Sequence, residues 1–505
     1  MDVIATSMIV GYLAAVTLLG VFLARRSSTS NQWAVAGGRM GALMVAMGIA
    51  GTRIGGAGTY GVAGDVITEG MWNLWYGVST FLALALVGLF FARPYRRLGL
   101  HTVGEIFWIR FRSRRCQRLT SLCVQTEYLV VNVIEPFVIA KILQGVTGIP
   151  FWLAIYVAAA VIIVYTALGG LWGAAVTNVI HCSVILLGLC AVSVAGLSHL
   201  GGWSGITEGV ANALEAGGTD PESWWSLTGA GWGAIIAMIL SAVIHTPAAS
   251  VYVNFSTAAR NERVLVWAFL LAGLVGALMP LLAGVVGMET LAQYGAEAQL
   301  SSYNTITRLA TDVNPWLGGI ALAAIVAAVI SSGGPILLSS ATMFVNDWLP
   351  FAARLSSSGR LRSFRVTTVV YGLVAATIAW LGNIGSILDL VLLAFAAVVP
   401  PAIAVGYLIY WKRTTEPGIF WGTGIGYTCG LVWYAAVRWT IAAGFTLSDQ
   451  PPAWRQVIHY CFVHDGKGID PSYITTLVPL VLIPLISLWT PDDQEGKDAF
   501  YAKVA

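Results

Sequence analysis

Charged side chains are scarce in this sequence. Asp, Glu, Lys and Arg make up 10% of its 505 residues, against 57% hydrophobic residues, whereas a soluble domain carries about a quarter charged residues. Apolar stretches of about 20 residues recur from end to end, each long enough to cross the hydrocarbon core of a bilayer. This composition excludes a soluble globular protein and predicts an all-α integral membrane protein that crosses the lipid bilayer many times.

Cysteine and histidine are also scarce, with six residues of each type. The cysteines show no paired spacing of the kind that binds a metal, and most of them fall in or beside apolar stretches. No HExxH or GxSxG motif occurs on any predicted span. We therefore expect neither an enzyme nor an organic cofactor.

The apolar stretches predict about thirteen membrane spans. Their approximate ranges are 5–24, 41–64, 71–92, 119–147, 151–167, 172–198, 229–255, 264–288, 316–347, 366–383, 386–411, 416–438 and 472–490. Basic residues gather in every second loop, such as 93–118 and 354–365, whereas the 200–228 loop has no Lys or Arg. Because loops rich in Lys and Arg stay in the cytoplasm, we expect an outer N-terminus, a cytoplasmic C-terminus and a location in the cytoplasmic membrane.

Two stretches interrupt the apolar helices with helix-breaking residues. The segment GIAGTRIGGAGTYG, residues 48–61, places six glycines and Arg53 between apolar neighbours, and VIHTPAASVY, residues 243–252, contains Pro247. Close packing through small residues is the competing interpretation of the glycines. Non-helical backbone in a bilayer must be buried in protein or line a wet cavity, because lipid cannot satisfy its N–H and C=O groups.

The two breaks are five predicted spans apart, which favours two inverted five-helix repeats that each open with a discontinuous helix. The expected organisation is an extra helix and loop (1–40), a first repeat (41–200), an extracytoplasmic loop (201–228), a second repeat (229–411) and two C-terminal helices with an outer loop and a short tail (412–505).

A pair of serines marks the predicted span at 316–347. Ala328, Ser331 and Ser332 follow an i, i+3, i+4 spacing and therefore share one helix face. Two neighbouring hydroxyls and a backbone carbonyl are hard, neutral oxygen ligands of the kind that suits Na⁺. The competing interpretation is that both hydroxyls bond back to their own helix.

Three ordered stretches resemble the sodium:solute symporter family, which includes bacterial sodium-coupled sugar, proline and sialic acid carriers. They are GIAGTRIGGAGTYGVAG, YTALGGLWGAAVTNVIH (165–181) and AAVISSGGPILLSSATMFVNDWL. The resemblance covers nearly the whole chain. It implies a LeuT-like fold of two inverted five-helix repeats with discontinuous first and sixth core helices, and transport by alternating access. It also implies a sodium site between the first and eighth core helices, whose oxygen ligands would come from Gly51, Ile54, Ala328, Ser331, Ser332 and, more weakly, Asn178.

Two positions depart from the family pattern. Asn178 stands where sodium-coupled members usually have an aspartate, and Arg53 lies between the presumed carbonyl ligands Gly51 and Ile54. One like-charge repulsion at about 6 Å costs about 3 kcal/mol at an effective dielectric constant near 20. Sodium binding should therefore be weak unless Arg53 is neutralised.

Three hypotheses explain Arg53. It binds an anionic group of the substrate, because a planar guanidinium suits a carboxylate; it forms an ion pair with Glu127 or Glu135; or it acts as a tethered cation in place of Na⁺. The candidate substrate-binding residues are Thr52, Arg53, Gly55, Asn132, Glu135, His245 and Ser250.

The sequence as a whole predicts a secondary active transporter that imports a small polar organic solute with Na⁺. Arg53 favours a solute with a carboxylate or another anionic group. Asn178 and Arg53 support a second hypothesis, a sodium-independent exchanger or uniporter of the same fold, and a third is a membrane sensor domain that acts with a separate kinase. The expected partners are the substrate and the lipid bilayer rather than nucleic acid, and a monomer is compatible with the sequence.

Overall fold

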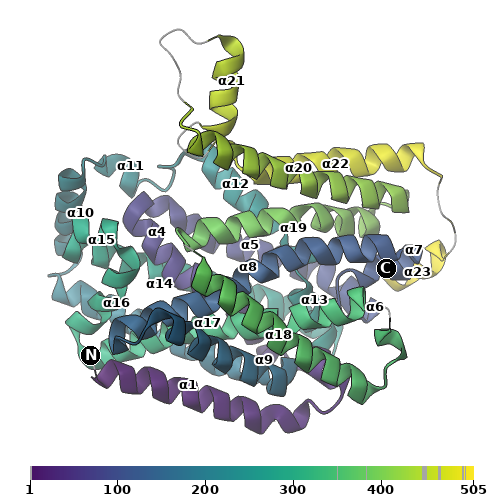
Figure 1. The fold of residues 1–505 in the computed structure, drawn as a ribbon, viewed down its shortest axis with the longest axis horizontal. Helices are drawn as coiled ribbons and strands as arrows, with labels where there is room; N and C mark the ends of the chain where they lie inside the picture. Colours follow the sequence, from purple (N-terminus) through teal and green to yellow (C-terminus); the bar gives the residue numbers. More distant parts are fainter. Residues whose placement is uncertain are drawn as a thin grey trace.

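The computed structural model describes residues 3–349, 351–382, 384–445, 452–463, 468–491, 494 and 496–504. Long helices run roughly along the longest axis of the molecule, and the two termini lie toward opposite ends of that axis (Figure 1). The long helices are α1 (Val3–Leu23), α8 (Arg114–Thr147), α9 (Phe151–His199), α14 (Glu262–Tyr294), α17 (Pro315–Met343), α18 (Ser357–Leu381), α19 (Ile387–Tyr410), α20 (Glu416–Ala442) and α22 (Pro471–Trp489). The shorter α5 (Trp75–Leu86) belongs to the continuous helical stretch Met71–Leu98.

Ten helical stretches in the described chain are long and apolar enough to cross a membrane, against about thirteen spans predicted from the sequence. The broken stretch 42–69 and α20 are not among the ten, and α9 covers a range for which two spans were predicted. The backbone of α9 leaves helical geometry at Gly170 (φ 58°, ψ −163°), between those two predicted spans. The all-helical membrane architecture is confirmed, whereas the number of crossings stays a prediction.

Both predicted helix breaks are present. Near the end of α3 (Ala42–Gly56), which continues through a π-helical turn into α4 (Val62–Glu69), Gly55 has φ 47° and ψ −167°, a conformation that essentially only glycine adopts. Between α12 (Gly231–Ile244) and α13 (Ser250–Ala258), a 3₁₀ turn contains Pro247, and the backbone becomes extended at Ala249. Proline lacks the N–H that would continue the helix, so each break follows from its own local sequence.

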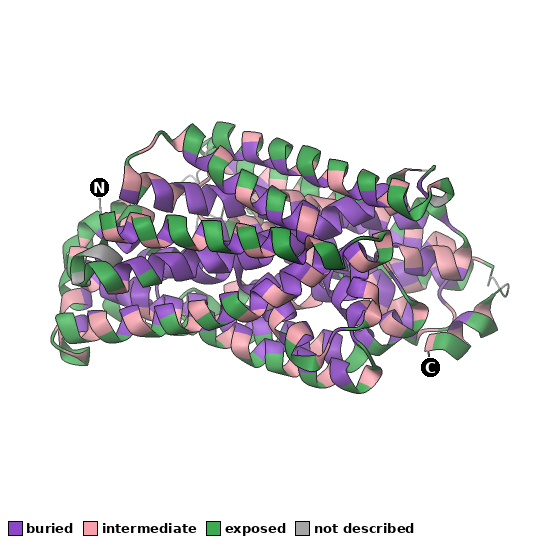
Figure 2. Ribbon diagram, turned by 90° about the horizontal axis from the view of Figure 1, so that it is seen from below, coloured by how far each residue is buried: buried purple, intermediate pink, exposed green. Residues whose placement is uncertain are grey.

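Among the ten candidate membrane spans, the one that contains α17 is the most deeply buried. In its most apolar 18-residue window 94% of the residues are buried, compared with 28% in the corresponding window of α1. The outer helices bury one face and expose the other (Figure 2), and the exposed face of α1 carries Val10, Leu18 and Phe22. Such an apolar outer surface suits lipid, and α17 with its serine pair lies in the protein interior.

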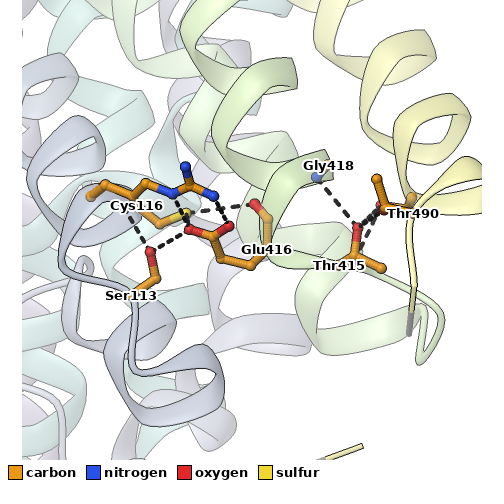
Figure 3. Close-up of polar contacts among 8 residues, drawn as sticks. Ser113, Cys116, Thr415, Glu416, Gly418 and Thr490 are labelled. Carbon is orange, nitrogen blue, oxygen red and sulfur yellow. Dashed lines mark hydrogen bonds and ion pairs between the residues drawn. The ribbon is translucent and has the colours of Figure 1, made fainter. Parts of the chain in front are cut away.

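The basic loops contact one another at one end of the bundle. Contacts between loops join Arg97 to Glu262, Arg260 to Met40, and Ser30 to Ser357. Figure 3 shows a further junction, at the start of α8 and of α20, where Ser113 donates to Glu416 Oε1 at 2.6 Å. Arg115 forms an ion pair with the same carboxylate. The predicted grouping of the basic loops is therefore confirmed, and which compartment they face stays a prediction.

Shorter helices occupy the loops. The 200–228 segment, expected to be a loop, contains α10 (Trp203–Gly217) and α11 (Pro221–Trp225). Figure 1 places them with α15 (Ala296–Leu300) and α16 (Ser302–Val313) at the end opposite α6 (Ala92–Leu98) and α7 (Glu105–Phe111). The remaining short helices are α2 (Ser30–Val35), α21 (Ala453–Phe462) and α23 (Lys497–Val504).

Candidate functional site

The break in α3 is packed directly against α8 and α17. A Cβ atom at Gly55 would lie 2.5 Å from Glu135 Oε1 of α8 and 2.8 Å from Ser332 Oγ of α17. The next backbone N–H, of Gly56, donates to Glu135 Oε2 at 3.1 Å. Glycine is therefore required at position 55 for two reasons, its positive φ and this close approach.

Four of the predicted sodium ligands come together between α3 and α17. Ser331 Oγ lies 2.8 Å from the Gly51 carbonyl oxygen and 2.7 Å from the Ala328 carbonyl oxygen. Ser332 Oγ lies 3.4 Å from the same Ala328 oxygen. All four residues are buried. The competing interpretation of purely local serine bonds is too narrow, because Ser331 also reaches across to α3.

The other two predicted ligands already form hydrogen bonds, although the amide oxygen of Asn178 is buried without a hydrogen-bond partner among the described residues. The Ile54 carbonyl oxygen accepts the N–H of Ala57, which leaves one of its two lone pairs. Asn178 of α9 donates through Nδ2 to the carbonyl oxygens of Gly48 (3.1 Å) and Ser331 (3.0 Å). Pro335 has no N–H to bond the Ser331 carbonyl within the helix, so Asn178 satisfies that oxygen and joins α9 to α3 and α17. A role for Ile54 or Asn178 as sodium ligands stays a prediction.

The hydrogen-bonding and ring partners of Arg53 are neutral groups, although Glu127 and Glu135 line the same cavity. Its guanidinium donates to the Ala242 carbonyl oxygen at 2.8 Å, lies 3.4 Å from His245 Nε2, and has its carbon 5.0 Å from the ring centroid of Phe395. The ion pairs that the structure records among the described residues do not include Arg53. Glu127 lines the same cavity, and its charge interacts with that of Arg53 without a direct contact, so the hypothesis of an ion pair with Glu127 or Glu135 stays a prediction.

His245 holds Arg53 in place. Its Nδ1 lies 2.7 Å from the Ser241 carbonyl oxygen, and its ring stacks on Phe395 with centroids 3.9 Å apart. An Nδ1–H that donates to this oxygen leaves Nε2 as the acceptor for Arg53, so the imidazole is neutral in this arrangement. His245 was predicted to bind substrate, and the structure shows that it contacts Arg53.

A small cavity lies at the break, beside Arg53. Its volume is about 30 Å³, which is room for about two water molecules. It is lined by Thr52, Arg53, Ile54, Gly55, Ala57, Tyr76, Glu127, Val131, Ile134, Glu135, Val251, Tyr252, Ser332, Ile336, Val391 and Phe395. An organic solute needs side chains to move apart before it can enter.

The predicted substrate-binding residues divide into two groups. Thr52, Arg53, Gly55 and Glu135 line the cavity, whereas Asn132, His245 and Ser250 do not. Asn132 donates to the Tyr128 carbonyl oxygen at 2.7 Å and to Ser340, and Ser250 Oγ accepts the N–H of Val103. In this conformation these polar side chains form hydrogen bonds to neighbouring protein groups and are not directed into the cavity.

Sequence reasoning missed the aromatic wall of the cavity. Tyr252 lies at the end of the second broken stretch, which was a usable signal. Tyr76 and Phe395 come from ordinary apolar stretches of α5 and α19. Nothing in their local sequence distinguishes them from residues that face lipid.

Comparison with known proteins identifies the class to which this fold and site belong. A family model described as "SSF: Sodium:solute symporter family" matches residues 33–426. The chain therefore belongs to the sodium:solute symporter family, and Na⁺-coupled solute transport is the activity that this membership supports.

The curated relatives are distant but cover most of the chain. The sodium-dependent multivitamin transporter of Oryctolagus cuniculus is 24% identical, with 97% of this chain and 77% of the relative covered. The sodium/glucose cotransporter 4 of Mus musculus is 26% identical, with coverages of 96% and 74%. The osmoregulated proline transporter OpuE of Bacillus subtilis is 22% identical, with coverages of 84% and 87%.

Solved structures share the fold. A Na⁺-coupled sialic acid symporter in a substrate-bound outward-open state matches with a TM-score of 0.72, at 21% identity, over 97% of this chain and 99% of that chain. Mhp1, a nucleobase-cation-symport-1 family transporter, matches with a TM-score of 0.58, at 14% identity, over 93% and 98%. The LeuT-like membrane transporter fold predicted from the sequence is confirmed.

Proposed function

We propose that this protein imports a small organic solute bearing a carboxylate, together with Na⁺, across the cytoplasmic membrane by alternating access. The observation that carries the proposal is Arg53, a buried cation in the wall of the cavity whose neighbours are a carbonyl, a hydroxyl, an imidazole and aromatic rings. Arg53 forms no direct ion pair with a described carboxylate, so an anionic group of the solute can contact its guanidinium, in competition with Glu127 and Glu135 of the same cavity.

The sodium ligands suggest how the ion controls the conformation. Gly51 belongs to α3, whereas Ala328, Ser331 and Ser332 belong to α17. An ion bound by oxygens of both helices holds them together, and its release lets them separate. Na⁺ therefore favours the conformation in which the two helices are close, by the difference between its affinities for the two conformations.

A sodium-independent exchanger or uniporter is the second candidate. It is favoured by Asn178, which brings no negative charge and directs its amide nitrogen to the carbonyl oxygens of Gly48 and Ser331. The two candidates differ in one measurable property, the dependence of solute uptake on a Na⁺ gradient.

The test is uptake into proteoliposomes, with equal gradients of NaCl or choline chloride. Proline and sialic acid, solutes named for the relatives, serve as carboxylates, and glucose serves as a solute without one. Arg53→Lys should lower affinity for the transported carboxylate by about tenfold to a hundredfold, because an ammonium cannot present a planar two-point donor, and a lost charged hydrogen bond costs about 1.5–3 kcal/mol.

Arg97→Lys is the matched control, because Arg97 pairs with Glu262 outside the cavity. Unchanged carboxylate affinity in Arg53→Lys would show that Arg53 does not bind the solute. Equal uptake in NaCl and choline chloride would favour the second candidate.

A further inference from the structure

Glu135 contacts both helices that carry the proposed sodium ligands. Its side chain is buried, and both carboxylate oxygens accept hydrogen bonds. Oε1 accepts the hydroxyl proton of Ser332 on α17 at 2.5 Å, and Oε2 accepts the N–H of Gly56 on α3 at 3.1 Å. The approach is so close that a Cβ at Gly55 would lie 2.5 Å from Oε1.

The oxygens of the proposed sodium site form a chain that ends at Glu135. The Gly51 carbonyl oxygen, Ser331 Oγ and the Ala328 carbonyl oxygen follow one another at 2.8 and 2.7 Å. The chain continues from Ala328 to Ser332 Oγ at 3.4 Å and to Glu135 Oε1 at 2.5 Å. Ser331 has a single hydroxyl proton but lies close to two carbonyl oxygens, those of Gly51 and Ala328. When that proton points at one carbonyl oxygen, the lone pairs of the other face the Ser331 oxygen directly. A cation relieves the repulsion between such lone pairs.

A sodium ion bound to this row of oxygens needs a negative group nearby. The proposed ligands are neutral carbonyls and hydroxyls, and Asn178 beside Ser331 is a neutral amide. Arg53 lines the same cavity as Ser332 and adds a positive charge. A sodium ion there would meet neutral dipoles and a repelling cation. Glu127 also lines the cavity and its charge interacts with that of Arg53, but the carboxylate hydrogen-bonded to the proposed ligand Ser332 is that of Glu135.

We propose that Glu135 supplies the negative charge of the sodium site. The inference rests on the sodium coupling proposed above and assigns to Glu135 a role in binding a small hard cation, where the sequence suggested contact with the solute. Its carboxylate lies against the proposed ligand Ser332, whereas the carboxylate whose charge interacts with Arg53 is that of Glu127. By accepting the hydroxyl proton of Ser332, Glu135 also leaves both lone pairs of that oxygen for the ion.

A purely structural role for Glu135 would be to cap the helix that restarts after Gly55. That role needs an acceptor for the Gly56 N–H, and an uncharged amide oxygen is also an acceptor. The two roles therefore separate in Glu135→Gln, which keeps the size and an acceptor oxygen but removes the charge.

The experiment measures Na⁺ binding to purified protein in detergent, without added solute. The melting temperature is followed against NaCl, with choline chloride holding ionic strength constant, since a ligand of the folded state stabilises it by mass action. A unit charge about 5 Å from the ion, at an effective dielectric constant of about 20, changes affinity by on the order of a hundredfold. The half-saturating Na⁺ concentration of Glu135→Gln should rise by that factor.

Glu289→Gln is the matched control. Glu289 is a buried acid of α14 that packs against Gly196 of α9 and does not line the cavity, so its variant should bind Na⁺ like the wild type. Glu135→Asp keeps the charge and should stay within about tenfold of the wild type, so a large loss of affinity in this variant contradicts the inference even if Glu135→Gln does not fold.

Three results overturn the inference. The first is Na⁺ affinity of Glu135→Gln within about threefold of the wild type. The second is a Glu135→Asp variant that loses affinity by a hundredfold or more. In both cases sodium-driven uptake by the wild type can persist, so the proposed function stands. The third is a wild-type protein that binds no Na⁺ and takes up solute equally in choline, which overturns the sodium coupling as well.

Discussion

Gly55→Ala tests whether the break in α3 builds the site. At φ 47° and ψ −167°, a residue with a Cβ stores about 1–3 kcal/mol of backbone strain. The new methyl group would also lie 2.5 Å from Glu135 Oε1 and 2.8 Å from Ser332 Oγ, closer than van der Waals contact allows. Both oxygens must move, and the carboxylate loses its place at the end of the oxygen chain.

We expect two effects from Gly55→Ala. The free energy of unfolding should fall by about 1–3 kcal/mol from backbone strain alone, seen as a lower melting temperature at a fixed heating rate. The half-saturating Na⁺ concentration in the same assay should rise by at least about tenfold, because displacement of a charge by 1–2 Å weakens a short-range interaction.

Gly173→Ala provides the control. A Cβ at Gly173, on α9, meets no atom within 4 Å, and alanine favours a helix over glycine by about 1 kcal/mol. This variant should match or exceed the stability of the wild type and bind Na⁺ normally. If Gly55→Ala melts and binds Na⁺ like the wild type, the break does not hold the site in the way the structure indicates.

Two further predictions concern the ion ligands and the topology. Ser332→Ala should raise the half-saturating Na⁺ concentration by at least about tenfold, since one of about five ligand oxygens is lost. Thr342→Ala is the control and should not change this concentration, because the Thr342 hydroxyl bonds back to Leu338 of the same helix. Equal responses of the two variants would contradict the assignment of Ser332 as a sodium ligand. An impermeant thiol reagent applied to intact cells should label Ser204→Cys but not Ser358→Cys, because the basic loops face the cytoplasm. Both positions are exposed, whereas Ser113, also in a basic loop, is buried against Glu416 and cannot report on topology. The reverse labelling pattern would show that every span has the orientation opposite to the predicted one.

Several features of the fold were predictable because they depend on short stretches of sequence. Gly55 and Pro247 stop helices through their own backbone chemistry, positive φ in one case and a missing N–H in the other. The basic loops could be grouped because their charges are read directly from the sequence. The number of crossings was harder to predict, since α9 passes through Gly170 with a bend where two separate spans were expected.

The candidate site was predictable only where its residues carry a local signal. Ser331 and Ser332 stand out as paired hydroxyls in an apolar helix, and Gly51 lies in the glycine-rich break. Tyr76 and Phe395 carry no such signal. Asn132 and Ser250 carry a polar signal that in the structure belongs to helix packing.

The sequence by itself determined where the chain is apolar enough to cross a membrane, where its helices break and which family it belongs to. These properties follow from local composition and from ordered motifs. Tertiary structure decided which groups share the site. Glu135 meets Ser332 across 197 positions of the chain, and Arg53 meets His245 across 192. The sequence offered Glu135 as a partner for Arg53, but in the folded protein its carboxylate contacts Ser332 and Gly56. This contact depends on tertiary packing, because a Cβ at Gly55 would collide with both Glu135 and Ser332.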